Sequence, residues 1–180
     1  SAFYFDIRKD TLYCDNLNSE KRKSCIVVLN ILLDCLLKWF APILSFTTEE
    51  IYLLVNKNKN ESIHLKKFIK IPDDWKNDNL NGKWEKLKRI RDVANISIES
   101  KRAKKLIGSS LESNIKIKLK KDLYDIAKDF DFAELCITSS ADVLLDNTID
   151  EELFVETFKA EGEKCVVCWK IRKGKCERHG

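Results

Sequence analysis

The amino-acid sequence predicts a mainly α-helical protein that ends in a small α/β part and a cysteine-rich tail. The chain has 180 residues, of which 44% are hydrophobic and 34% charged, with only five Gly and two Pro. This composition is typical of a folded helical protein and excludes disordered or collagen-like chains. Apolar residues first recur at three- and four-residue steps, and the period then switches to two. We therefore expect a helical domain over residues 1–112, an α/β subdomain over 113–162 and a separate tail over 163–180.

Two long helices are predicted. The first covers residues 20–40 and ends before Pro42, with an apolar stripe that we expect to be buried and that consists of Ile26, Leu29, Leu33, Leu36, Leu37 and Phe40. The second starts at Lys83 and should end near Gly108, a plausible C-cap. Its apolar face consists of Leu87, Ile90, Ala94 and Ile98.

Shorter elements are expected between and after these helices. Residues 47–50 form the pattern of a capping box, with Thr47 and Glu50 opening a short helix that continues to Val55. The Asn- and Lys-rich composition of residues 56–82 predicts a long connection, in which residues 62–65 run extended. Strict alternation predicts a strand at residues 114–119, and the pattern further on favours a helix at 123–130 and strands at 133–139 and 153–160.

The net charge of +4 is unevenly distributed. Residues 86–105 contain eight Lys or Arg and two acids, and residues 164–180 contain six and one, whereas residues 129–163 contain eleven acids and one Lys. Clustered basic charge is typical of a surface that contacts a phosphate backbone, although a solvated Lys-rich face is the alternative. Near the end of the second helix, cations also offset the helix dipole. The candidate contacts on that helix are Lys88, Arg91, Lys101, Arg102, Lys104 and Lys105.

The tail has the ligand pattern of a zinc site. Two short knuckles, C-x2-C and C-x2-H, are joined by seven residues, and they present Cys165, Cys168, Cys176 and His179. Tetrahedral zinc takes four thiolate or imidazole ligands, so one structural zinc ion is expected, with a partial or vestigial site as the alternative. Aromatic and cationic side chains around these ligands are suited to single-stranded or looped nucleic acid. These are Trp169, Lys170, Arg172, Lys173, Lys175 and Arg178.

Catalysis finds little support in the sequence. A phosphate-binding glycine loop and a nucleophile elbow are both absent from the sequence, and His64 lies beside Ile63 and Leu65 without an activated nucleophile. No membrane span or signal-peptide pattern is found. The chain has no Met and starts inside an apolar aromatic run, which we interpret as a piece of a longer protein.

Several motifs, in order along the chain, resemble the C-terminal part of bacterial isoleucyl-tRNA synthetases. The opening run Phe-Asp-Ile-Arg-Lys-Asp-x-Leu-Tyr-Cys and the closing Cys-x-x-Cys-Trp are typical of that family. The motif Ala-Pro-Ile-x-x-Phe-Thr-x-Glu-Glu-Ile is shared with valyl, leucyl and other class I relatives. Further similarity lies at residues 62–65, 84–92, 101–112 and 134–139.

The resemblance implies a helical bundle that grips the anticodon stem-loop of tRNA-Ile, followed by a small α/β subdomain and a zinc element. The complete enzyme attaches isoleucine to its tRNA with ATP and Mg in a catalytic domain, and the HIGH and KMSKS motifs of that domain are absent from this sequence. We therefore expect a non-catalytic, cytoplasmic, monomeric fragment that contacts the catalytic body of its own polypeptide and no membrane. The alternatives are the equivalent domain of a valyl or leucyl enzyme, or a structural docking module.

The resemblance places the zinc ligands of the family on Cys165, Cys168, Cys176 and His179. The family usually has a fourth Cys at the position of His179, and a longer insert usually precedes its second ligand pair.

Overall fold

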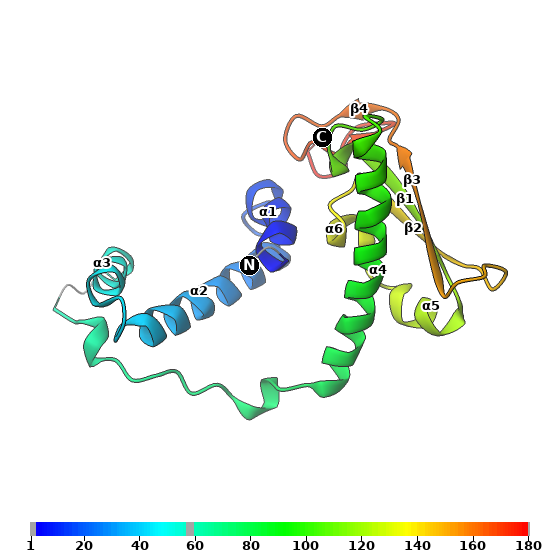
Figure 1. The fold of residues 1–180 in the computed structure, drawn as a ribbon. Helices are drawn as coiled ribbons and strands as arrows, with labels where there is room; N and C mark the ends of the chain where they lie inside the picture. Colours follow the sequence, from blue (N-terminus) through cyan, green and yellow to red (C-terminus); the bar gives the residue numbers. More distant parts are fainter. Residues whose placement is uncertain (1–2, 57–59, 180) are drawn as a thin grey trace. The chain divides into compact units, whose positions relative to one another are not determined.

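The computed structural model describes residues 3–56 and 60–179, and its chain forms two compact units (Figure 1). One unit joins Ser1–Asp15 to Asn77–Gly180, and the other is Asn16–Lys76. The mainly helical fold with a small α/β part is confirmed. Both predicted boundaries, at residues 112 and 162, lie inside the first unit. The division into functional domains therefore stays a prediction.

The unit Asn16–Lys76 is built on the first predicted long helix, α2 (Glu20–Phe40). The Ser19 side chain caps this helix by accepting a hydrogen bond from the Arg22 N–H. The helix is confirmed, but of the stripe that we expected to be buried only Leu37 is buried. It packs in a small core with the residues Ala41, Tyr52 and Ile63.

The capping box predicted at Thr47 is wrong. Helix α3 (Ser45–Val55) begins two residues earlier, and the Thr48 hydroxyl donates to the Leu44 carbonyl at 2.9 Å. Residues 62–65, predicted to be extended, instead contain the 3-10 helix η1 (Ile63–Leu65), and a second one, η2 (Asp73–Trp75), follows. The Glu49 carboxylate of α3 accepts a hydrogen bond from the Ile63 N–H at 2.9 Å and so holds η1 next to α3.

The second unit is organised by α4 (Asp78–Ala103), which starts five residues before the predicted position. The Asn77 side chain provides the N-cap by accepting from the Leu80 N–H at 2.9 Å. The predicted apolar face is confirmed, because all four of its residues are at most 2% exposed: Leu87, Ile90, Ala94 and Ile98. These four side chains share a core with residues of the sheet, and Figure 1 shows α4 running beside the strands.

Helix α4 ends at Ala103, and Gly108 is not its C-cap. Lys105 adopts the left-handed conformation with φ of 56°. Its N–H donates to the Arg102 carbonyl at 2.8 Å, and the Leu106 N–H donates to the Lys101 carbonyl at 3.1 Å. These two hydrogen bonds make a Schellman motif, in which Lys105 occupies the position that glycine usually takes.

The sheet contains three strands in the order β2-β1-β3. Strand β1 (Ser113–Leu119) confirms the predicted alternation, and it pairs in parallel with β2 (Ser140–Leu145) and antiparallel with β3 (Leu153–Lys159). The predicted third strand is thereby confirmed as β3. Alternate residues of β1 point into the core, where Ile117 and Leu119 are fully buried.

The strand predicted at residues 133–139 is wrong. The 3-10 helix η3 (Ser110–Glu112) leads into β1, and the crossover to β2 contains α5 (Lys121–Ala127) and α6 (Phe132–Leu135). The Asp131 side chain caps α6 by accepting from the Glu134 N–H, and Ile137 has φ of 57°. A φ of this sign lies outside the extended region and interrupts the backbone of a regular strand, and the strand begins only at Ser140.

Helix α1 (Tyr4–Cys14), for which no element was predicted, packs on this same unit. Its Ile7 side chain is buried in the core that α4 and the sheet share. The Glu134 carboxylate of α6 accepts from Arg8 at 2.7 Å and from the Thr11 hydroxyl at 3.1 Å. No helix in the described part of the chain is long and apolar enough to cross a membrane.

Candidate metal centre and nucleic-acid interface

The tail is shaped by a two-stranded ladder, β4 (Glu163–Lys164) and β5 (Ile171–Arg172). Gly162 precedes it with φ of +125°, and a Cβ at this position would lie 2.1 Å from the carbonyl oxygen of Arg172. Only glycine fits here. Two backbone hydrogen bonds then close the turn, one from Cys165 N to Lys170 O and one from Trp169 N to Cys165 O, both 3.0 Å long.

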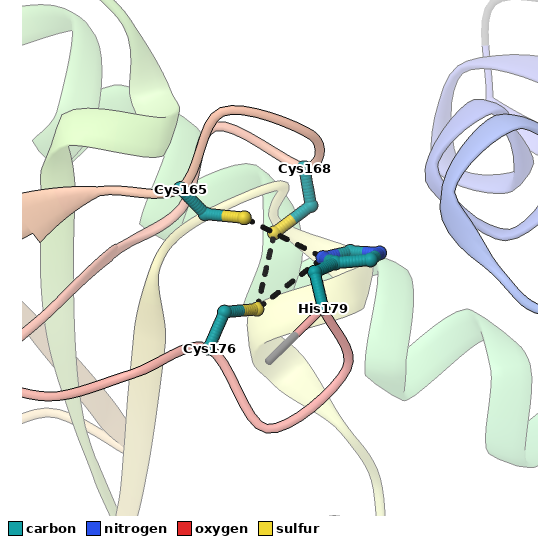
Figure 2. Close-up of side chains that lie close together, drawn as sticks. All are labelled: Cys165, Cys168, Cys176 and His179. Carbon is teal, nitrogen blue, oxygen red and sulfur yellow. Dashed lines mark hydrogen bonds between the residues drawn. The ribbon is translucent and has the colours of Figure 1, made fainter.

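The four predicted zinc ligands converge at the end of this hairpin (Figure 2). Their ligand atoms all lie within 4.8 Å of one another. The Nδ1 atom of His179 is 3.4 Å from the Cys165 sulfur and 3.3 Å from the Cys176 sulfur, and the Cys168 and Cys176 sulfurs are 3.8 Å apart. Cys168 is buried, and the other three ligands are half-buried.

This geometry fits a tetrahedral zinc ion. Zinc–sulfur bonds of about 2.3 Å and zinc–nitrogen bonds of about 2.0 Å place tetrahedral sulfurs about 3.8 Å apart and nitrogen about 3.5 Å from sulfur. The observed separations of 3.8 Å and of 3.3 to 3.4 Å lie close to these values. Three thiolates and one imidazole also form a donor set that zinc prefers, so the residues present fit the ion.

The polypeptide around the cluster already favours thiolates at two of the three cysteines. Backbone N–H groups of Cys168 and Val167 point at the Cys165 sulfur and lower the pKa of that thiol to about 6. Burial would raise the pKa of Cys176, but the Arg178 N–H and the His179 ring lower it overall. Burial raises the pKa of Cys168 to about 11, so this thiol must release a proton when a metal binds.

The ring of His179 is held from its other side. Its Nε2 atom lies 2.8 Å from the carbonyl oxygen of Cys14, at the end of α1. Because a carbonyl only accepts, Nε2 carries the proton, and Nδ1 is left to face the sulfurs. This hydrogen bond is the first cause of the raised pKa of His179.

The predicted RNA-contacting residues of the tail differ in their surroundings. Trp169 is 58% exposed and left-handed, with φ of 63°, and the Lys164 ammonium lies 5.1 Å from its ring centroid. Lys173 and Lys175 are exposed, and Lys173 pairs with Glu161 at 2.9 Å. Of the remaining three, Lys170 is buried and Arg172 is half-buried, whereas Arg178 is exposed as a residue but pairs its side chain with carboxylates at the end of α1.

The predicted residues on α4 and in the turn that follows it also divide into two groups. Lys104 and Lys105 are exposed, as is Arg102, which pairs with Glu99 at 2.6 Å, and Lys101 is half-buried. Further back on the helix, Lys88 pairs with Glu85 at 2.8 Å. Arg91, predicted as a phosphate contact, instead donates to the Leu135 carbonyl at 2.9 Å and lies over the Phe3 ring.

Sequence reasoning did not show that the two basic segments lie at the same end of one unit. The Leu111 carbonyl accepts from the Ser139 hydroxyl, and the oxygen of that hydroxyl accepts from the Ile171 N–H at 2.6 Å. This chain of hydrogen bonds ties β5 to the residues that follow α4. The end of α4 and the zinc-ligand tail therefore lie at the same end of the unit, as Figure 1 also shows.

Comparison with known proteins decides the family. Residues 1–119 match the family described as the anticodon-binding domain of tRNA ligase. The chain belongs to this family. Its tail lies beyond the matched residues, but similarity to individual proteins extends through it.

Three relatives of this chain, all of them isoleucine–tRNA ligases, show which kind of tRNA ligase it is similar to. It is 62% identical to an isoleucine–tRNA ligase of Pelagibacter ubique over 179 residues, which are 99% of this chain and 19% of the relative. It is 46% identical to the isoleucine–tRNA ligase of Agrobacterium fabrum and 37% identical to that of Bartonella quintana, over 95% and 94% of this chain and 18% of each relative. The chain thus spans about a fifth of the length of these relatives. The resemblance to bacterial isoleucyl-tRNA synthetases is confirmed.

Proposed function

We propose that this chain is the tRNA-binding region of an isoleucine–tRNA ligase and contacts the anticodon stem-loop of tRNA-Ile. The observation that carries the proposal is the match of residues 1–119 to anticodon-binding domains, together with 62% identity to an isoleucine–tRNA ligase across nearly the whole chain. The whole protein would attach isoleucine to tRNA-Ile with ATP and Mg. That chemistry would belong to a catalytic body outside this chain. The chain itself would only bind and position the RNA.

The proposed functional division follows the sequence: an anticodon-binding part at residues 1–112, an α/β part at 113–162 and a zinc element at 163–180. Cys165, Cys168, Cys176 and His179 would hold one structural zinc ion. The ion would supply the free energy to fold a tail that has almost no apolar core of its own.

The exposed cations at one end of the larger unit would contact RNA phosphates. The residues best placed for this are Lys104, Lys105, Lys173 and Lys175, all of them exposed. The exposed Trp169 ring, with Lys164 beside it, would stack on an unpaired base of the loop. Phosphate contacts supply affinity, whereas stacking on loop bases favours a single-stranded loop over a duplex.

A binding titration tests the proposal. tRNA-Ile and a non-cognate tRNA are titrated with the zinc-loaded chain at two salt concentrations. With four phosphate contacts, affinity should fall roughly a hundred-fold between about 50 and 200 mM salt. Tighter binding of tRNA-Ile at both concentrations supports the proposal, whereas equal affinity for the two tRNAs removes the specificity.

A structural docking role is the second candidate, and the engagement of Arg91 and Arg178 inside the protein favours it. Charge reversal at the end of α4 separates the two roles. The residues to reverse are Lys101, Arg102, Lys104 and Lys105. Loss of RNA binding with unchanged melting supports the RNA contact, and lower melting with unchanged RNA binding supports the structural role.

A further inference from the structure

The end of α1 contacts the predicted zinc loop on two sides. The carbonyl of Cys14 lies 2.8 Å from Nε2 of His179, and the Cys14 sulfur is 3.7 Å from the Val167 carbonyl oxygen. Val167 belongs to the first ligand knuckle and His179 to the second. One residue of α1 thus reaches both knuckles, although it lies more than 150 residues away in the sequence.

Arg178, the neighbour of His179, extends this contact into a clamp. Its guanidinium donates to Asp10 at 2.7 Å through Nη1 and to Asp15 through Nη2. The three side chains are 29%, 25% and 16% exposed, respectively, so the ion pairs are partly shielded from water. Two carboxylates on one guanidinium restrict its orientation more than a single surface pair does.

We propose that Asp10, Asp15 and the Cys14 carbonyl are positioning groups for the zinc site, so that zinc binding and docking of the end of α1 strengthen each other. Asp10 and Asp15 hold Arg178 and with it the Cys176–His179 loop, and the Cys14 carbonyl fixes the tautomer and plane of the imidazole. Metal-bound histidines generally depend on such a partner at the second ring nitrogen. Arg178, predicted as an RNA contact, becomes a residue that aligns a ligand.

The coupling works in both directions. If docking of the end of α1 raises the affinity of the site for zinc, zinc binding must stabilise that docking by the same coupling free energy. Zinc should therefore order the end of α1, near Asp15. The earlier part of α1 is held in another way, since Ile7 is in the core and Arg8 pairs with Glu134 on α6. That part should not respond to the metal.

The proposal rests on the proposed zinc site, and its test uses zinc affinity without RNA. The dissociation constant is measured by competition with a chromophoric chelator for the wild-type chain, the double variant Asp10→Asn/Asp15→Asn and the control Asp6→Asn. Asp6 lies on the same helix and pairs only with exposed Lys9 among the contacts that the structure gives it. The double variant should bind zinc about ten- to a hundred-fold more weakly, and the control should match wild type.

Hydrogen exchange of the wild-type chain provides a second readout that needs no substitution. On zinc addition, the Asp15 amide, which donates to the Thr11 carbonyl, should exchange more slowly, while the amide of Ile7 should not change. Equal zinc affinity for the double variant and wild type, or the same Asp15 exchange with and without zinc, overturns the coupling while leaving the zinc site intact. A wild-type chain that binds no zinc overturns the site and the coupling together.

Discussion

Gly162 is the residue of the tail at which one added methyl group should have the largest effect on the zinc site. Its φ of +125° lies in a region that residues with a side chain rarely adopt, and the new Cβ of Gly162→Ala would meet the Arg172 carbonyl oxygen at 2.1 Å. The backbone strain alone costs about 1–3 kcal/mol. The β5 backbone must also move, so we take the upper part of this range, about 2–3 kcal/mol, as the loss of hairpin stability.

If the tail folds as it binds zinc, as we propose, this loss appears in the zinc dissociation constant. An energy of about 2–3 kcal/mol corresponds to roughly 30- to 140-fold weaker binding. Chelator competition measures the change. Gly174→Ala is the matched control, because it lies in the same tail and a Cβ there meets nothing within 4 Å. If Gly162→Ala binds zinc as tightly as Gly174→Ala, the hairpin does not control the site and the reasoning fails.

Three further predictions concern RNA binding, the core and the metal. Trp169→Gly should keep the zinc affinity of the wild type, because glycine accepts the left-handed conformation of this residue. In a titration, the variant should lose about 1–3 kcal/mol of RNA-binding free energy. Unchanged RNA affinity would exclude stacking on this ring. Ile117→Ala, at a fully buried position of β1, should lower the free energy of unfolding by about 2–5 kcal/mol in urea denaturation, and a loss under 1 kcal/mol would contradict the core assignment. Chelation of the metal should speed amide exchange in β4 and β5 and leave β1 protected. If β1 loses as much protection as β4 and β5, zinc stabilises the whole unit and the prediction fails.

The elements with strong periodicity could be predicted from sequence. The stripe Leu87, Ile90, Ala94 and Ile98 marks a helix face, and alternation over residues 114–119 marks a strand, because each pattern reflects burial on one side. The boundaries depend on weaker local interactions. Thr47 has the residue type of a cap, yet the helix starts earlier and the Thr48 hydroxyl bonds back to Leu44. Residues 133–139 are apolar enough for a strand, but the Asp131 cap starts a helix there.

The candidate site was predictable only in its ligands. Cysteine and histidine spacing is a local signal, so Cys165, Cys168, Cys176 and His179 could be named, and the structure brings their ligand atoms together. The partners Asp10 and Asp15 lie more than 160 residues before Arg178, and spacing carries no information over that distance. For the same reason, basic charge alone could not separate Arg178, which is paired within the protein, from exposed Lys175.

The central claim, recognition of the anticodon loop, is tested most directly with short RNA hairpins. The zinc-loaded chain is titrated with the anticodon stem-loop of tRNA-Ile and with a hairpin of the same stem and length whose loop bases are replaced. Phosphate contacts are the same in both, so a difference reports on the loop alone. We predict roughly 5- to 140-fold tighter binding of the tRNA-Ile loop, as expected when hydrogen bonds to base edges contribute about 1–3 kcal/mol. Equal affinity for the two hairpins would contradict the account.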